Sequence, residues 1–519
     1  MSAHVTLRFV TDANSSRGGD SAGSAASRAS AAPAVRDLTA AEIAGITRGE
    51  LLVAGPRPVR GGAVDSRLVV PGNLFVARPG EKTDGHRHLA AAAAAGAAAV
   101  IVRDLPADQV LPPDVAVIRV ADPLLALHAV ASAWRVRFDP LVVGVTGSIA
   151  KTSTKDAVAA VLAARMRTLK SEGNQNNEVG LPLTVLRLGP EHEAAVLEMG
   201  MYVGGEIAQL AAIARPQIGL VTAVHPVHLS RIGTLDAIAR AKGELLEALP
   251  ADGTAILNAD DEIVRLMGAR TRARSVTYGF APDADVRAEH VESLGRNGMR
   301  FDLLARAGRG RVTIPTLGRH AVHNALAAAA VGFVAGYSID DVARGLAGAS
   351  TSAHRGELID AGAITILDDS YNASPRSMRA AMELLATLPG RHVAVVGEMF
   401  ELGAASDAGH REVGETAAGL VDLLVVIGEG AALTAAAARA AGLPADRIVR
   451  VADRVAAQSA LRDLLAAGDV VLVKASRGAE LERLVVALRD EWRARDGIAG
   501  REGAAARPGA PGHNADHGR

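Results

Sequence analysis

Short apolar runs alternate with longer amphipathic segments from about residue 37 to residue 499. Compact runs of β-branched and other apolar residues predict buried strands, and apolar residues that recur every three to four positions predict helices. The predicted strands are 73–77, 98–102, 115–120, 141–146, 194–198, 218–223, 254–257, 364–367, 392–396, 423–426, 448–451 and 470–474. Strands that alternate with helices of this length indicate doubly wound parallel sheets of the α/β class.

The pattern divides the chain into three blocks, which we interpret as domains over residues 37–138, 139–350 and 351–499. An alanine-rich helix is predicted over 89–95 in the first block and a helix over 234–247 in the second. Residues 1–36 contain SSRGGDSAGSAASRASAAPA, and residues 500–519 end in ARPGAPGHNADHGR. Such compositions bury no core, so we expect disordered tails at both ends or, for the first, a misassigned start.

Composition excludes several classes of function. The 519 residues include 56 Lys and Arg and 57 Asp and Glu, for a net charge of −1. No basic stripe with interleaved aromatic residues is present, so we expect no nucleic-acid partner. The absence of cysteine excludes disulfides and thiolate chemistry. No signal peptide is evident, and the longest apolar run, 89–102, is too short to span a bilayer. A soluble, cytoplasmic protein is predicted.

One segment, LVVGVTGSIAKTSTKDAVAAVLAA over 141–164, carries candidate chemistry. It places a turn of small residues and then Lys151 and Thr152 between a buried strand and a helix that is predicted from about Thr154. This order is typical of a phosphate-binding loop, whose backbone N–H groups face phosphates at a helix N-terminus. Lys151 would reach the terminal phosphates and the Thr152 hydroxyl would bind Mg²⁺. The predicted nucleotide-binding residues here are Thr146, Gly147, Ser148, Ile149, Ala150, Lys151, Thr152 and Ser153.

The match to the generic loop is incomplete, because that pattern has glycine at the positions of Val145 and Ala150. The loop by itself is therefore equally consistent with an ordinary strand–turn–helix that has an exposed lysine.

Further polar residues follow the strands of the second block. Because ligands bind at the carboxyl ends of parallel strands, these residues are candidates for the same site. They are Glu198, His225, His228, Lys242 on the predicted helix, and Asn258. Each alone is equally typical of a solvated strand end, a loop histidine or an exposed helix lysine.

Together, these residues and several longer segments resemble the Mur ligase family, over nearly the whole chain outside the tails. The segments GNQNNEVGLPLTVL (173–186) and LDDSYNASPRSMRAAM (367–382) are the most discriminating, because they characterise one branch of the family. The others are DSRLVVPGNLFVARPGEKTDGH (65–86), TGSIAKTS (146–153), VLEMGMYVGGEI (196–207), HLSRIGTLDAIARAKGE (228–244), LNADD (257–261), GRHAVHNALAA (318–328), HRGEL (354–358), VVGEMFELG (395–403) and VKASRGAELE (473–482).

The resemblance implies an ADP-forming amide ligase of cytoplasmic peptidoglycan synthesis, and hence a contribution to cell shape and division. In this branch a carboxylate of UDP-N-acetylmuramoyl-tripeptide attacks the γ-phosphate of ATP to give an acyl phosphate. The amine of D-alanyl-D-alanine then displaces inorganic phosphate. The implied fold has an N-terminal UDP-sugar-binding domain, a central P-loop ATPase domain and a C-terminal Rossmann-like domain. A monomer without membrane insertion is expected.

The family pattern also implies roles for residues of this chain. Two Mg²⁺ ions would be held by Thr152 and Glu198 and by His228 with Lys242, the last being carbamoylated by CO2. Asn258 and Asn324 would contact adenine, while Arg355 and Asp369 would reach ATP when the third block closes onto the second. The catalytic set is then Lys151, Lys242, His228, Arg355 and Asp369. The uridine-nucleotide segment is Asp65, Ser66 and Arg67, and the other substrate contacts are Asn174, Asn176, Asn177, Asp369, Asn372 and Ser374.

Three departures from the family pattern bear on activity. Ala150 replaces glycine, which costs on the order of 1 kcal/mol if its φ must be positive, so we predict a working but weaker nucleotide site. Ala321 replaces an asparagine, and one adenine contact is expected to be lost. The family's ALKGE is ARPGE here, with Pro79 at the lysine position and a cation one place earlier, at Arg78.

Two alternatives stay open. One is a related ligase with another amine acceptor, although no DNPR-type motif of the diaminopimelate- or lysine-adding enzymes is present, and folate or poly-amino-acid ligases would lack GNQNNEVG and DDSYNASP. The other is a catalytically silent paralogue that binds nucleotide or cell-wall precursor as a scaffold. The imperfect loop supports this second alternative, and the retained metal and lysine positions argue against it.

Overall fold

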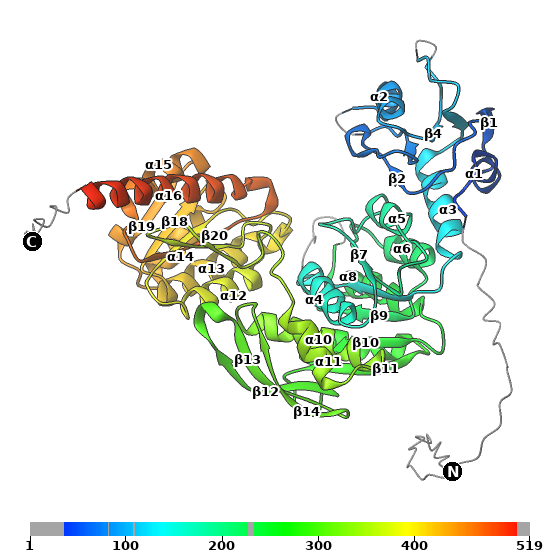
Figure 1. Ribbon diagram of the computed structural model, residues 1–519. Coiled ribbons are helices and arrows are strands. Elements are labelled where there is room, and N and C mark those ends of the chain that lie inside the picture. Colours follow the sequence, from blue (N-terminus) through cyan, green and yellow to red (C-terminus); the bar gives the residue numbers. More distant parts are fainter. Residues whose placement is uncertain (1–35, 81–82, 107–108, 227–232, 506–519) are drawn as a thin grey trace, which may run out of the picture. The chain divides into compact units, whose positions relative to one another are not determined.

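A computed structural model describes residues 36–80, 83–106, 109–226 and 233–505. Its strands form three sheets that follow one another along the chain, coloured blue to cyan, cyan to green, and yellow to red (Figure 1). Each sheet carries helices from its own part of the sequence. The predicted α/β class with three sheets is therefore confirmed. In the described part of the chain, no helix is long and apolar enough to cross a membrane.

The first sheet has the strand order β1-β5-β4-β3-β2. Its strands are β1 (Glu50–Val53), β2 (Gly62–Ala63), β3 (Leu74–Val76), β4 (Ala99–Val102) and β5 (Ala116–Arg119). Strands β2 to β5 pair in parallel, and β1 is antiparallel to β5. Helix α2 (Leu89–Ala94) packs against one face, and α1 (Ala40–Thr47) and α3 (Pro123–Arg135) pack against the other.

The second sheet has the order β14-β13-β12-β11-β10-β9-β6-β8-β7. Its strands are β6 (Leu141–Thr146), β7 (Thr168–Lys170), β8 (Ala194–Glu198), β9 (Ile218–Val221), β10 (Thr254–Asn258), β11 (Arg274–Gly279), β12 (Val286–Ser293), β13 (Met299–Ala305) and β14 (Gly308–Ile314). Strands β6 to β12 pair in parallel. Chain order reverses direction at β6, which lies between β8 and β9, and ligands bind at such switch points in parallel sheets.

Helices cover both faces of the second sheet. One face packs against α4 (Lys151–Ala163), α10 (Arg319–Val334) and α11 (Ile339–Ala347). The other packs against α6 (Glu206–Ala214) and α8 (Leu235–Glu247), with α5 (Gly180–Val185) and α9 (Glu262–Leu266) beside them. Helix α8 approaches β6 closely because Gly144 has no side chain: a Cβ there would be 2.8 Å from Leu245 Cδ1.

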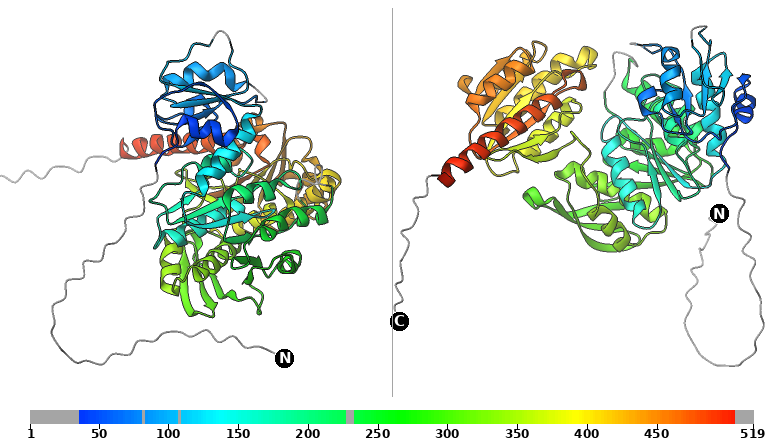
Figure 2. Two further views of the ribbon diagram at one scale, coloured as in Figure 1. Left: turned by 90° about the vertical axis from the view of Figure 1, so that its right-hand side faces the viewer. Right: turned by 45° about the horizontal axis from the view of Figure 1, so that its top comes forward.

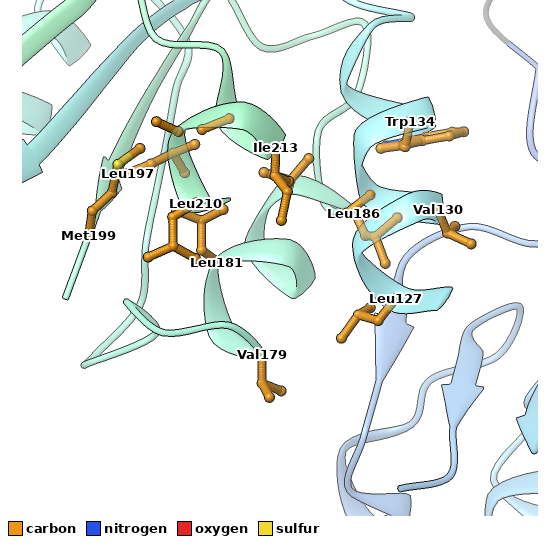
Figure 3. Packing of buried hydrophobic residues seen from close by; sticks show 14 of the residues in the cluster. Leu127, Val130, Trp134, Val179, Leu181, Leu186, Leu197, Met199, Leu210 and Ile213 are labelled. Carbon is orange, nitrogen blue, oxygen red and sulfur yellow. The ribbon is translucent and has the colours of Figure 1, made fainter. Parts of the chain in front are cut away.

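Helix α3 contributes to the core of the second sheet as well as to the first. Its Leu127, Val130 and Trp134 belong to one buried cluster with residues of α5, α6 and β8 (Figure 3). The Trp134 indole Nε1 donates a hydrogen bond to the Leu188 carbonyl at 3.0 Å, and Arg135 Nε donates to the Ala214 carbonyl at 2.7 Å. Helix α3 is thus held to the second block by buried apolar contacts and by hydrogen bonds that satisfy its buried polar side chains.

The third sheet has the order β15-β16-β20-β17-β18-β19. Its strands are β15 (Glu357–Asp360), β16 (Thr365–Asp368), β17 (Arg391–Val396), β18 (Leu423–Ile427), β19 (Ile448–Val451) and β20 (Asp469–Lys474). One face packs against α12 (Pro375–Leu385), α13 (Ser406–Leu420) and α14 (Ala432–Ala440). The other packs against α15 (Arg454–Leu464) and α16 (Glu482–Ala505), and Figure 2 shows α16 in red along that face.

The structure corrects several sequence-based expectations. The second sheet is not wholly parallel, because β12, β13 and β14 form an antiparallel meander. Its strands alternate buried with exposed or charged positions, so a search for continuous apolar runs passes over them. Antiparallel edge strands β1 and β15 were also missed, because each has only four residues and none of them is fully buried. The predicted strand 218–223 ends at Val221.

Two helix bounds also differ from the prediction. Helix α4 begins at Lys151 rather than near Thr154, because small and polar residues in its first turn weaken the apolar periodicity there. Helix α16 runs to Ala505, so the segment expected to be disordered from residue 500 begins in a helix.

Candidate active site

The loop after β6 folds as a phosphate-binding loop would. It runs from Gly147 to Ala150 at the carboxyl end of a central strand, and α4 begins at the next residue. Ala150 has φ 63° and ψ 4°, and it is the N-cap of α4 without a side-chain hydrogen bond to the helix. The Ala150 side chain therefore makes no hydrogen bond to the first backbone N–H groups of α4. An anion that binds at a helix start needs such N–H groups.

Lys151 lies over this loop. Its Nζ donates hydrogen bonds to the Gly147 carbonyl at 2.7 Å and the Ser148 carbonyl at 3.4 Å. Burial lowers the pKa of Lys151; the Glu198 carboxylate opposes that shift, and the charge of Arg355 adds to it. The side chain is half-buried rather than solvated, which argues against an ordinary exposed lysine after a turn.

Glu198 provides a buried carboxylate beside the loop. It ends β8 directly across from Val145 of β6, and it is 1% exposed. Its Oε1 accepts a hydrogen bond from Asn176 Nδ2 at 2.8 Å. Its Oε2 is buried without a hydrogen-bond partner among the described residues. An unpaired carboxylate oxygen in such a place is costly unless a cation binds it.

Residues around Glu198 fix its position, and sequence reasoning missed most of them. The Glu198 backbone N–H donates to Ser171 Oγ at 3.1 Å, and the buried Lys155 donates to the Ser171 carbonyl at 2.8 Å. Thr146 is fully buried and its hydroxyl donates to the Met199 carbonyl at 2.8 Å, so its contact with a nucleotide stays a prediction. Lys155 lies one turn beyond Lys151 on α4, a spacing that alone does not distinguish a binding lysine from a supporting one.

The three predicted asparagines of GNQNN have different surroundings. Asn176 holds Glu198 as described, and its backbone N–H donates to the Asn174 carbonyl at 2.7 Å. Asn177 Oδ1 accepts from the Gly180 N–H at 2.9 Å, which stabilises the start of α5. Binding of a muramoyl-peptide by Asn174, Asn176 and Asn177 stays a prediction.

Lys242 on α8 is the second buried lysine of this site. It is 3% exposed and has no hydrogen bond or ion pair with the described residues. Its pKa is lowered well below the ordinary value, first by burial and then by the positive charge of Lys151. His228, the predicted partner of Lys242 at a metal ion, lies outside the described residues.

The residues predicted to contact the adenine base lie on β10 and α10. Asn258 Nδ2 donates to the Thr222 carbonyl at 2.7 Å, and its Oδ1 lies 3.0 Å from His323 Nε2. Asn324 Oδ1 accepts from Thr154 Oγ1 at 3.2 Å. Asn324 also lines a cavity with Ser153, His320, Ala321 and Arg355, among other residues. Ala321 is buried against apolar neighbours, and whether an adenine contact is lost there stays a prediction.

The predicted residues of the third block cluster at the carboxyl ends of β16 and β20. Arg355 Cζ lies 3.8 Å from the ring centroid of Tyr371. The buried Lys474 donates to Asp369 Oδ2 at 2.5 Å and to the Asn372 carbonyl at 2.8 Å. Ser374 is the N-cap of α12. Sequence reasoning missed Lys474 and Tyr371, although both lie in segments that carry the resemblance.

In the first block, Asp65 and Arg67 are joined by a bidentate ion pair, with Arg67 Nη2 2.6 Å from Asp65 Oδ2. Hydrogen bonds from the Arg67 side chain and backbone lower the pKa of Asp65 to about 2. The Arg67 side chain is largely exposed, so its contact with a sugar nucleotide stays a prediction, as does that of Ser66. At the ARPGE departure, the Arg78 carbonyl accepts from the Gly85 N–H at 2.9 Å.

Three family descriptions match successive parts of the chain. They are the Mur ligase family catalytic domain over residues 59–135, the Mur ligase middle domain over 145–332, and the Mur ligase glutamate ligase domain over 354–477. A UDP-N-acetylmuramoyl-tripeptide–D-alanyl-D-alanine ligase of Mycobacterium tuberculosis (strain H37Rv) is 39% identical over 499 residues, which cover 87% of this chain and 98% of that protein. This chain belongs to the Mur ligase family.

Other Mur ligases agree with this assignment. The Escherichia coli K12 relative of the same name is 39% identical over 82% of this chain and 93% of its own length. A crystal structure of MurF from Acinetobacter baumannii matches with a TM-score of 0.78 at 30% identity, covering 88% of this chain and all of that one. A MurF ligase of Thermotoga maritima in complex with ADP matches with a TM-score of 0.73 at 28% identity, covering 84% and 99%.

The left-handed backbone of Ala150 leads to a first prediction. We expect Ala150→Gly to raise the free energy of unfolding by about 1 kcal/mol or less, because relief of left-handed strain exceeds the added entropy of glycine in the unfolded chain. Affinity for ATP should rise, and an unchanged affinity would contradict the expected weakening of the site by Ala150. Thermal melts and calorimetric titration with ATP measure both quantities.

A matched control is Ala163→Gly, near the other end of α4, where the side chain is exposed and the backbone helical. It should lower the free energy of unfolding by about 0.5–1 kcal/mol. If Ala150→Gly destabilised the protein as Ala163→Gly does, strain at Ala150 would be disproved.

The two buried lysines lead to a second prediction. Lys242→Met should raise the free energy of unfolding at pH 7 by about 1 kcal/mol or more, because it replaces a buried amine, whose charged form is disfavoured by burial, with an apolar side chain. Lys155→Met is the control and should lower it by about 1–3 kcal/mol, because Lys155 is hydrogen-bonded to Ser171.

Stability should also depend on pH. Because its pKa is depressed, folded Lys242 loses its proton at a lower pH than the unfolded chain does. The contribution of Lys242 to stability therefore rises with pH from the folded pKa up to about 10.4, and Lys242→Met should flatten that rise. Urea unfolding at several pH values measures this slope, and an unchanged slope in the variant would contradict the assignment.

Proposed function

We propose that this chain joins D-alanyl-D-alanine to UDP-N-acetylmuramoyl-tripeptide, coupled to the cleavage of ATP to ADP and phosphate. The observation that carries the proposal is the convergence of Lys151, the unpartnered Glu198 oxygen and Lys242 at one edge of the second sheet. Relatives that bear the name of this activity, at 39% identity over most of the chain, support the same substrates.

In the first step, a carboxylate oxygen of the muramoyl-tripeptide attacks the γ-phosphorus of ATP and ADP leaves, giving an acyl phosphate. Both reactants are anionic, so cations must offset their repulsion. Lys151, which already hydrogen-bonds two carbonyls of the loop, would move its ammonium onto the terminal phosphates. Arg355 would add a second positive charge, and it lines the same cavity as Ser153, which lies two residues after Lys151 on α4.

The residues at the loop fit a magnesium ion. Glu198 supplies a buried carboxylate oxygen without a protein donor, and Thr152 is a buried hydroxyl residue at the start of α4. Within the described ranges, no group of three or more His, Cys, Asp or Glu side chains could hold a metal ion. This agrees with Mg²⁺ sites that use one or two protein ligands and substrate phosphates. When bound, Mg²⁺ would neutralise charge on the phosphates.

A second magnesium ion and a carbamate on Lys242 form part of the same proposal. An ammonium does not bind a cation, whereas a carbamoylated lysine presents anionic oxygens. Carbamoylation needs the neutral amine. Burial and the nearby charge of Lys151 lower the pKa of Lys242, which favours the neutral amine. His228 would be the companion ligand, and it lies outside the described residues.

In the second step, the amine of the dipeptide attacks the acyl carbon, phosphate leaves, and the amine loses a proton. The third block would bring the dipeptide, with Asp369, Asn372 and Ser374 lining its pocket. Lys474 holds both Asp369 and the Asn372 carbonyl, so these two groups are fixed relative to each other. We infer that the enzyme acts as a monomer in the cytoplasm, where ATP is available.

The proposal predicts coupled phosphate release. Release should require ATP, Mg²⁺, UDP-N-acetylmuramoyl-tripeptide and D-alanyl-D-alanine together, and omission of any one should reduce the rate at least about tenfold, because no acyl phosphate can form and turn over. A malachite-green assay measures the rate, and Lys151→Met serves as an inactive control. Release with another amine in place of the dipeptide would indicate a different acceptor. No release at all, with nucleotide still bound, would indicate the silent scaffold.

The carbamate predicts dependence on CO2. Stripping CO2 and bicarbonate from the buffer should lower kcat several-fold, on the scale of losing one metal ligand, and bicarbonate should restore it. The control is Lys242→Gln, which should be weakly active and indifferent to bicarbonate. If wild-type kcat were equal in both buffers over hours of incubation, the carbamate would be ruled out.

A further inference from the structure

A hydroxyl from a neighbouring strand lies against the phosphate loop. Thr222 directly follows β9 and is 3% exposed. Its Oγ1 donates a hydrogen bond to the Ile149 carbonyl at 2.6 Å. The same oxygen lies against Gly147, because a Cβ built on Gly147 would be 1.9 Å from it. The hydroxyl is therefore enclosed between two residues of the loop.

Thr222 is itself firmly anchored. Its backbone N–H donates to the Thr146 carbonyl at 2.9 Å, and its own carbonyl accepts from Asn258 Nδ2 at 2.7 Å. The carbonyl of the next residue, Ala223, accepts a hydrogen bond from the Ser148 N–H of the loop at 2.8 Å. The hydroxyl thus projects from backbone that is tied to the ends of two strands.

The carbonyl that Thr222 holds belongs to the peptide group between Ile149 and Ala150. Ala150 has φ 63°, a left-handed conformation that alanine disfavours. A half-turn of this peptide would bring the φ of Ala150 to the negative side. It would also turn the Ile149 carbonyl away from Thr222 and reverse the Ala150 N–H at the start of α4. The hydrogen bond therefore opposes the relaxation that alanine favours.

We propose that Thr222 is a positioning residue for the nucleotide. Its hydroxyl keeps the Ile149–Ala150 peptide in the orientation that binds phosphate, in a loop that has alanine where glycine would adopt this conformation freely. Thr222 acts through the loop and does not touch the nucleotide. This inference rests on the proposed function, because it requires a nucleotide at this loop.

ADP binding to the full-length protein, measured by calorimetry, tests the inference. Thr222→Val keeps the shape but removes the hydrogen bond, and it should weaken ADP binding about fivefold or more. Thr222→Ser keeps the hydroxyl and should bind ADP within about twofold of wild type. Thr254→Val is the matched control, because Thr254 is also buried but begins β10 at the opposite end of the strands. It should leave ADP affinity unchanged.

The decisive comparison combines Thr222→Val with Ala150→Gly. With glycine at position 150 the peptide no longer favours the flip, so Thr222→Val should then weaken ADP binding by less than about twofold. An equal loss in both backgrounds, or no loss in either, would overturn the inference, because a purely structural hydroxyl has no reason to depend on residue 150.

Folding of the variants is checked by thermal melts. Should Thr222→Val fail to fold, Thr222→Ser and Thr222→Ala carry the same comparison, since they differ by the hydroxyl alone. Absence of ADP binding by the wild type would overturn the proposed function and this inference with it. Binding by the wild type with an unaltered affinity in Thr222→Val would overturn this inference alone.

Discussion

Buried charge at the carboxyl edge of β6 and β8 is the constraint on which the site depends. Lys242 and Glu198 are almost wholly inaccessible to solvent, and Lys151 is half-buried beside them. Removing such groups from water costs several kcal/mol for each ion, so the surrounding structure must hold them in place. Hydrogen bonds from Asn176 and to Ser171 do so for Glu198, and α8 does so for Lys242. An arrangement of this cost suits a site whose charges are completed by ligands.

Close packing makes that edge possible. Helix α8 brings Lys242 toward the loop because Gly144 leaves space for Leu245 against β6. Helix α4 begins directly after the loop, and the ammonium of its first residue, Lys151, is hydrogen-bonded to loop carbonyls. Each element is ordinary alone. They coincide at the point where strand order reverses, which is where ligands bind in parallel sheets.

The loop combines local strain with external support. Alanine at position 150 has the left-handed conformation that glycine adopts without cost, yet the turn keeps the form of a phosphate-binding loop. Thr222 donates a side-chain hydrogen bond to the Ile149 carbonyl of the loop. The Ser148 hydroxyl of the loop donates to the His225 carbonyl and accepts from the His225 N–H. A departure from a local motif is therefore not by itself a sign of lost function, because tertiary contacts can compensate for it.

The amino-acid sequence by itself determined the α/β class, most parallel strands, the strand–loop–helix over β6 and α4, and the family. Those features are local, because an apolar run that ends in Glu198 or in Thr146-Gly147 shows its strand and its edge residue directly. Only the tertiary structure decided the sign of φ at Ala150, the partner of Asn176, the missing partner of one Glu198 oxygen and the support from Lys155, Ser171, Thr222 and Lys474. It also decided the meander of β12 to β14, whose half-exposed strands lack an apolar run. Hydrogen-bond partners that lie tens of residues apart leave no periodic signal in a single sequence, since the fold alone brings them together.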